Sequence, residues 1–167
     1  MPDDRLRQSA IKTLKICEAA RVMLTTVESC TGGLIAASLT EISGSSAVVE
    51  SGLVTYSNSA KTRLAGVPDP LIIQHGAVSQ AVAIAMAEGG LSRSAADIAI
   101  AVTGIAGPSG GSAEKPVGTV HMACAGKGRV TQHIVRNYGA IGRSEIRTRT
   151  VLDALALVQT ILSDDAW

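Results

Sequence analysis

Aromatic side chains are scarce in this 167-residue chain: they make up 2% of the residues, and phenylalanine is absent. Tyr56, Tyr138 and Trp167 are the whole set. A core of ordinary density must therefore be built from aliphatic side chains, which suits helices packed closely against a sheet. Apolar residues still reach 46% of the chain, which excludes a disordered polypeptide.

The chain also lacks an excess of charge of either sign, since it has 15 basic and 14 acidic residues and a formal net charge of +1. Without a broad positive field, a nucleic-acid partner is not expected. No stretch approaches the roughly 18 uninterrupted apolar residues of a membrane span. The acidic, polar opening at residues 1–5 does not resemble a signal peptide. We therefore expect a cytoplasmic protein with no membrane partner.

Cysteine is sparse: Cys17, Cys30 and Cys124 are odd in number and far apart in the sequence. No pair has CxxC spacing, and the three histidines form no HxxxH-like pattern, so neither a metal site nor a cofactor is expected. Reduced thiols are the better interpretation of such cysteines.

Alternating strand-like and helix-like segments predict an α/β fold, with residues 1–167 forming a single three-layer α/β/α domain. The sheet is expected to be mixed and mostly parallel, with one antiparallel hairpin. The expected strands are Met23–Val27, Val48–Ser57, Ile98–Val102, Gly118–Ala125 and Arg129–Arg136. The expected helices are Leu6–Ala20, Thr31–Thr40, a short one from the Ser57–Ser59 caps to Leu64, Asp69–His75, Ser79–Ser92 and Ile146–Leu162.

Three polar loops follow three of these strands, at residues 29–33, 56–61 and 103–111. Ligands of open α/β sheets collect beyond the carboxyl ends of parallel strands. If the three strands are parallel, the loops share one edge of the sheet and can form a composite site.

The first loop contains Ser29, Cys30 and two glycines at the start of a predicted helix. Free amides at a helix N-terminus favour an anion or a developing oxyanion. Ser29 is therefore a candidate nucleophile, although a simple helix cap is the alternative. Cys30 is a rival nucleophile if its thiol pKa is lowered, or a small buried apolar residue if it is not.

A serine nucleophile needs a base, and Lys61 is the preferred candidate because the histidines fall in a loop and inside strands. The amine must lose its proton near neutral pH, which requires desolvation to lower its pKa. Tyr56, hydrogen-bonded to this lysine, would relay protons or orient the base. The alternative for Lys61 is a solvated surface side chain.

Six stretches carry a resemblance to a known family: Glu28–Gly33, Gly52–Asn58, Ala60–Lys61, His75–Ser79, Thr103–Pro108 and Lys115–Val120. In this order and spacing they resemble the CinA C-terminal domain family, whose stand-alone members are nicotinamide-nucleotide amidohydrolases. The resemblance departs at Tyr138–Arg143, where the family often carries an acid directly before the arginine and this chain has a glycine.

The resemblance implies hydrolysis of nicotinamide mononucleotide to nicotinate mononucleotide and ammonia, in pyridine nucleotide recycling, without metal or cofactor. It places the catalytic roles on Ser29, Lys61 and Tyr56. From the loops themselves we expect the substrate contacts to be Cys30, Thr31, Gly32, Gly33, Asn58, Thr103, Gly104, Ala106, Gly107, Lys115 and Arg143, with Lys115 or Arg143 as the phosphate partner. A homo-oligomer, preferably a dimer, is also expected. The alternative function is a non-catalytic nucleotide-binding module associated with competence or damage.

Overall fold

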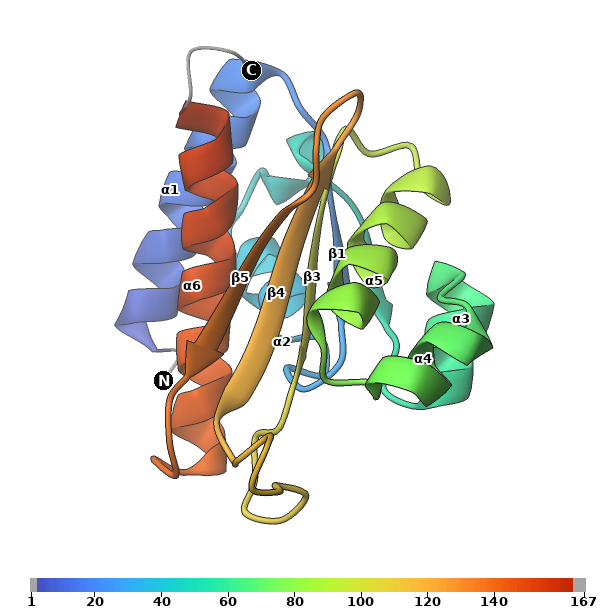
Figure 1. Cartoon of the computed structure of the whole chain (residues 1–167). Coiled ribbons are helices and arrows are strands. Elements are labelled where there is room, and N and C mark those ends of the chain that lie inside the picture. The colour runs from blue at the N-terminus through green and yellow to red at the C-terminus, as the bar shows by residue number, and fades with distance from the viewer. Residues whose placement is uncertain (1–2, 164–167) are drawn as a thin grey trace.

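Five strands form one sheet in the order β2-β1-β3-β4-β5 (Figure 1). The computed structural model describes residues 3–163. The strands are β1 (Leu24–Glu28), β2 (Val49–Val54), β3 (Ile98–Gly104), β4 (Thr119–Gly126) and β5 (Gln132–Asn137). The helices are α1 (Asp4–Ala20), α2 (Leu34–Thr40), α3 (Asn58–Ala65), α4 (Asp69–His75), α5 (Gln80–Ser92) and α6 (Arg143–Ser163), with a short 3-10 turn, η1, at Ser45–Ala47.

The direction of the strands confirms the predicted mixed sheet. Strand β1 pairs in parallel with β2 on one side and β3 on the other. Strand β4 runs antiparallel to β3, and β5 completes the hairpin against β4. The three neighbouring parallel strands therefore end at the same edge of the sheet, as the sequence predicted.

Helices cover both faces of the sheet, which confirms the three-layer arrangement (Figure 1). Helices α1, α2 and α6 lie on one face, while α3, α4 and α5 lie on the other. Both faces of the central strands are consequently buried, and all five residues of β1 are shielded from solvent. This burial explains the continuous apolar run at Ile98–Val102 of β3.

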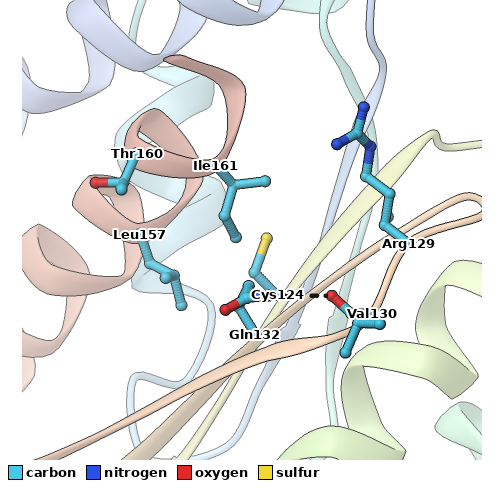
Figure 2. A pocket seen from close by; sticks show the side chains of 8 residues that line it. Cys124, Arg129, Val130, Gln132, Leu157, Thr160 and Ile161 are labelled. Atoms are coloured by element: carbon cyan, nitrogen blue, oxygen red, sulfur yellow. Dashed lines mark hydrogen bonds between the residues drawn. The ribbon is translucent and has the colours of Figure 1, made fainter. Parts of the chain in front are cut away.

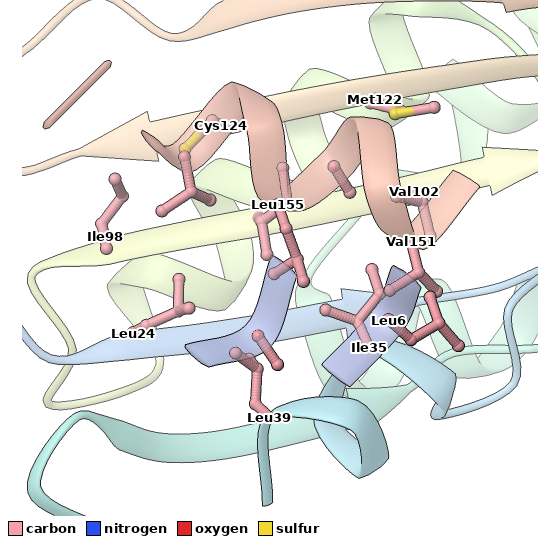
Figure 3. Packing of buried hydrophobic residues seen from close by; sticks show 14 of the residues in the cluster. Leu6, Leu24, Ile35, Leu39, Ile98, Val102, Met122, Cys124, Val151 and Leu155 are labelled. Carbon is pink, nitrogen blue, oxygen red and sulfur yellow. The ribbon is translucent and has the colours of Figure 1, made fainter. Parts of the chain in front are cut away.

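Aliphatic side chains build the larger core, between the sheet and helices α1, α2 and α6 (Figure 3). Its members include Leu24, Ile98 and Met122 from the strands and Leu155 from α6, all fully buried. The scarcity of aromatic residues is thus met by many smaller side chains from several elements.

Helix α5 approaches its neighbours closely because it carries two adjacent glycines. A Cβ at Gly89 would lie 1.6 Å from the carbonyl oxygen of Ala65, at the end of α3. A Cβ at Gly90 would lie 2.3 Å from a methyl group of Val27 in β1. The end of helix α3 therefore packs directly against the backbone of α5, and α5 in turn packs closely on β1. These contacts fix the position of α3 relative to the sheet.

Two helix starts differ from the predictions by three residues, and α1 begins at Asp4, two residues before the expected Leu6. Helix α2 begins at Leu34 rather than Thr31, because Gly33 has a φ of 96° and sits in the left-handed region as the N-cap. Helix α6 begins at Arg143 rather than Ile146. The Ile146 amide donates to the carbonyl oxygen of Gly142 at 3.0 Å and closes this earlier first turn. No helix within residues 3–163 is long and apolar enough to cross a membrane.

Candidate active site

A cavity of about 250 Å³ lies where the loops after β1, β2 and β3 meet. Its lining residues come from the loops after β1 and β2, from α3, from the connection between α4 and α5, from the end of β3 and the loop after it, and from the start of α6: Ser29, Cys30, Tyr56, Asn58, Lys61, Ala77, Val78, Thr103, Gly104, Ala106 and Arg143. The parallel pairing of the three strands is what brings these sequence-distant loops together.

Ser29 and Lys61 face each other in this cavity. The Lys61 Nζ lies 3.0 Å from the Ser29 Oγ, although 32 residues separate them in the sequence. Ser29 follows directly after β1, and its amide donates to the Val102 carbonyl oxygen of β3 at 3.1 Å. Lys61 lies in the second turn of α3, a helix capped by the Ser57 hydroxyl, which accepts from the Ala60 amide at 3.1 Å.

The Lys61 amine is buried and has three oxygen atoms as close neighbours. Only 1% of the residue is exposed. Besides Ser29 Oγ, its Nζ contacts the carbonyl oxygens of Thr55 at 2.8 Å and Tyr56 at 3.3 Å. Carbonyl oxygens only accept, so a neutral amine gives its two N–H groups to them and turns its lone pair to the Ser29 hydroxyl.

Burial also lowers the pKa of the Lys61 amine below its ordinary value of 10.5, because an ammonium loses hydration there. No carboxylate forms an ion pair with Lys61 within residues 3–163. Burial therefore favours the unprotonated amine, and the geometry places it within hydrogen-bond distance of the Ser29 hydroxyl.

The turn after Ser29 is organised differently from the expected helix N-terminus. Glu28, fully buried, accepts the amides of Ile35 at 2.8 Å and Ala36 at 3.0 Å. A carboxylate from β1 thus occupies the positive end of α2, so the amides left for a developing oxyanion are those of the turn before α2. The amides of Cys30 and Thr31 in the turn itself donate to no backbone carbonyl oxygen within residues 3–163.

The Tyr56 side chain does not make the predicted hydrogen bond to Lys61. Its hydroxyl instead accepts from Arg143 Nη2 at 3.0 Å, and the residue is 58% exposed. Lys61 contacts only the backbone oxygen of Tyr56. Arg143 also donates to the Gly107 carbonyl oxygen at 3.0 Å, so its guanidinium joins the loops after β2 and β3 at the rim of the cavity.

The remaining predicted contacts divide into three groups. Asn58, Thr103, Gly104 and Ala106 line the cavity as expected. Thr31, Gly32 and Gly33 belong to the turn after Ser29 but do not line the cavity, and Gly107 joins the site only through the carbonyl oxygen that accepts from Arg143. Lys115 lies outside the lining, because its Nζ donates to the carbonyl oxygen of His75 at 2.7 Å.

Sequence reasoning missed Ala77 and Val78, which line the cavity. Neither carries a reactive group, so residue chemistry alone gives no signal for them. The Ala77 carbonyl oxygen accepts from the Thr103 hydroxyl at 2.9 Å, which ties this segment to the end of β3. Their position between two helices in the matched stretch His75–Ser79 was the available clue.

Cys30 and the histidines do not compete for the chemistry. Burial raises the pKa of the Cys30 thiol to about 12, and a protonated thiol is a weak nucleophile. His121 and His133 pair with each other across β4 and β5, at 3.0 Å between Nδ1 and Nε2. None of the three histidines lines the cavity. No group of three or more side chains that could hold a metal ion is found within residues 3–163.

A second cavity, of about 350 Å³, lies between the β4–β5 hairpin and the end of α6 (Figure 2). Leu157, Thr160 and Ile161 face Cys124, Val130 and Gln132 across it. Its possible nucleophiles are the Cys124 thiol, whose pKa is raised by burial, and the Thr160 hydroxyl, which donates to the Ala156 carbonyl oxygen at 2.9 Å. The cavity therefore offers no activated group comparable with Ser29 and Lys61.

Comparison with known proteins agrees with this geometry. Residues 6–162 match the family model described as the CinA C-terminal domain. A putative competence-damage inducible protein of Symbiobacterium thermophilum is 50% identical over 148 residues, which cover 83% of this chain and 34% of that protein. A CinA-like protein of Geotalea daltonii is 54% identical over 132 residues, 79% of this chain and 32% of that protein. The chain thus spans about a third of the length of these curated relatives.

Solved structures show the same fold. The competence/damage inducible protein CihA from Agrobacterium tumefaciens has a TM-score of 0.93 and 48% identity, covering 98% of both chains. A CinA superfamily protein from Klebsiella pneumoniae has a TM-score of 0.90 and 32% identity, covering 97% of this chain and 99% of that one.

Proposed function

This chain belongs to the CinA C-terminal domain family, and on that premise we propose that it is an amidohydrolase acting on the carboxamide of nicotinamide mononucleotide. The products are nicotinate mononucleotide and ammonia. The observation that carries the proposal is the 3.0 Å separation of Lys61 Nζ and Ser29 Oγ, with the other two Nζ contacts made to carbonyl oxygens.

The first chemical step is attack by Ser29. The lone pair of neutral Lys61 accepts the Ser29 proton as the Oγ–carbon bond forms at the carboxamide. The developing oxyanion is stabilised by amides of the nucleophile turn, for which Cys30 and Thr31 are available. Each such donor contributes roughly 3 kcal/mol to the transition state.

The second half of the reaction returns the proton. Protonated Lys61 donates to the leaving nitrogen, which departs as ammonia and leaves an ester of Ser29. Water, deprotonated by the same amine, then attacks the ester and releases the carboxylate. Because the Tyr56 hydroxyl bonds Arg143, this scheme assigns the proton transfers to Lys61 alone and gives Tyr56 a place at the rim.

The substrate class rests on the rim and on the family resemblance. Arg143 presents a guanidinium beside the cavity, held by Tyr56 and Gly107, and guanidinium groups bind phosphate well. We assign the phosphate of the nucleotide to Arg143, and not to Lys115, whose Nζ is engaged with His75.

Ammonia release from nicotinamide mononucleotide tests the proposal. The purified protein is expected to produce ammonia and nicotinate mononucleotide, and Ser29→Ala is expected to abolish both. Nicotinamide riboside, which lacks the phosphate, serves as a matched control substrate. Its KM is expected to be higher than that of nicotinamide mononucleotide. Binding of the nucleotide without any turnover would instead favour the non-catalytic module, and an active Ser29→Ala variant would exclude the mechanism.

A further inference from the structure

A buried carboxylate directly precedes the proposed nucleophile, and the mechanism above does not use it. Glu28 is fully buried and accepts four hydrogen bonds, from the amides of Ile35 and Ala36 and from the hydroxyls of Thr31 at 2.7 Å and Thr26 at 3.3 Å. Since Gly33, the N-cap of α2, has no side chain, Glu28 acts as the cap from the preceding strand. It thereby spans the turn that contains Ser29.

Thr31 is the point where this turn is held from two sides. Its hydroxyl donates to Glu28, as above, and its carbonyl oxygen accepts from Arg147 Nη2 at 2.8 Å and from the Leu34 amide at 3.1 Å. The residue is fully buried. With the side chain and the carbonyl both engaged, the orientation of the adjoining peptide groups is fixed.

Arg147 comes from α6, one helical turn after the rim residue Arg143. Two features of its position disfavour stability: it places a cation near the N-terminus of a helix, and its Nε is buried with no partner within residues 3–163. No ion pair of Arg147 is found within those residues either. Arg147 donates a hydrogen bond to the Thr31 carbonyl oxygen, and this contact with the turn accounts for an arginine at the position.

We propose that Glu28 and Arg147 are positioning residues that act through Thr31 to set the geometry of the Ser29 turn. Glu28 holds the turn from the sheet side, and Arg147 holds it from α6. Their joint effect is to aim the Ser29 hydroxyl at Lys61 and to leave the Cys30 and Thr31 amides pointing away from protein acceptors. The inference rests on the proposed role of Ser29 as a nucleophile, and not on the identity of the substrate.

The test compares Arg147→Met with Arg149→Met. Both remove a guanidinium from α6, but Arg149 bonds the exposed Glu145 at 2.9 Å and makes no contact with the turn. Two readouts are used: kcat and KM for ammonia release, and the rate of Ser29 labelling by a fluorophosphonate at several pH values. In the labelling reaction a Ser29 Oγ–phosphorus bond forms, the phosphorus–fluorine bond breaks, fluoride leaves, and Lys61 takes the proton.

Misplacement of a reacting group by about 1 Å can lower a rate by roughly 100-fold, and we expect Arg147→Met to lower kcat and the plateau labelling rate by about 10-fold to 100-fold. KM and the pH midpoint of labelling should stay unchanged, because neither Arg143 nor Lys61 is altered. Arg149→Met should remain within twofold of wild type. Arg147→Lys should recover part of the rate, since an ammonium can still donate to the Thr31 carbonyl oxygen.

Glu28→Gln keeps the inference testable if Arg147→Met fails to fold, as judged by circular dichroism and thermal unfolding. The carboxamide turns an N–H group toward donors that need an acceptor, so the same loss of kcat at unchanged KM is expected. A folded Arg147→Met or Glu28→Gln protein with wild-type kcat and labelling rate would overturn the inference. A rise in KM with unchanged kcat would also overturn it, because it would make these groups binding residues.

The two proposals fail in different ways. If wild-type protein is labelled at Ser29 but releases no ammonia from the nucleotide, the proposed substrate is wrong. The labelling rates of the variants then still test whether Glu28 and Arg147 position the turn. If wild-type protein releases ammonia but does not react with the fluorophosphonate, the kcat values of the variants alone test the positioning role. A wild-type protein that does neither overturns the nucleophile and the positioning inference together.

Discussion

Replacing Lys61 with methionine tests the central pair of the site by activity and by stability. Methionine keeps an unbranched stem of similar size and removes the amine. If Lys61 is the general base, its loss is expected to reduce turnover by about 10²-fold to 10⁴-fold. At about 1.36 kcal/mol per factor of ten, this raises the barrier by roughly 3 to 5 kcal/mol.

The stability arm of this prediction follows from the lowered pKa of the buried amine. In the unfolded chain Lys61 keeps its ordinary pKa of 10.5, while burial lowers the pKa in the folded protein. Between these two values the unfolded state binds one proton more than the folded state, so the free energy of unfolding rises with pH. The maximum slope for one proton is about 1.4 kcal/mol per pH unit. Below the folded pKa both states are protonated and the slope from this group vanishes.

Urea unfolding of wild type and Lys61→Met, at a series of pH values from neutral to 10.5, measures this slope. The difference between their free energies of unfolding should shift in favour of wild type as pH increases. The exposed Lys12→Met on α1 is the matched control and should leave activity unchanged. A pH-independent difference between wild type and Lys61→Met would refute the lowered pKa, and ammonia release within tenfold of wild type would refute the role of general base.

Three further substitutions test neighbouring parts of the structure. Cys30→Ala should keep ammonia release within a few-fold of wild type, because the buried thiol has a pKa of about 12; loss of all activity would revive the cysteine mechanism. Gly89→Ala should destabilise the protein by about 1 to 3 kcal/mol in urea unfolding and reduce kcat. The new Cβ would meet the Ala65 carbonyl oxygen and displace α3, the helix that carries Lys61. Unchanged stability would contradict this contact. Tyr56→Phe should change the free energy of unfolding by less than about 0.5 kcal/mol, as expected for an exposed side chain. It should raise KM, because Arg143 loses its hydrogen bond to the Tyr56 hydroxyl. An unchanged KM with a large loss of kcat would instead favour a proton relay through the phenol.

Much of the fold followed from local sequence features. Helix α4 has the predicted bounds, Asp69–His75, and Ser79 caps α5 as expected by accepting the Val82 amide at 3.3 Å. Buried apolar runs such as Ile98–Val102 identified the central strands, because strands covered on both faces select apolar residues throughout. Such features depend on neighbours in the sequence, so they can be read without knowing the tertiary structure.

The side-chain contacts of the site were harder to predict. The partner of the Tyr56 hydroxyl is Arg143, 87 residues away on α6, and no local pattern links them. Lys115 carries the right charge for phosphate but lies against His75, 40 residues earlier. Glu28 had a readable signal, a charged residue closing a fully buried strand, yet its role as the cap of α2 required the path of the chain through the turn. The homodimer and the substrate stay predictions.

The sequence by itself determined which residues can react: a serine in a glycine-rich turn after one buried strand, and a lysine in a short helix after another. It also determined that these strands alternate with helices, which favours parallel neighbours and a shared edge. Only the tertiary structure decided that Lys61 is buried, that two carbonyl oxygens lie within hydrogen-bond distance of its Nζ, and that the third close neighbour of Nζ is the Ser29 hydroxyl. The physical reason is that desolvation and hydrogen-bond direction depend on atoms from several elements, brought together only when the sheet and its helices pack.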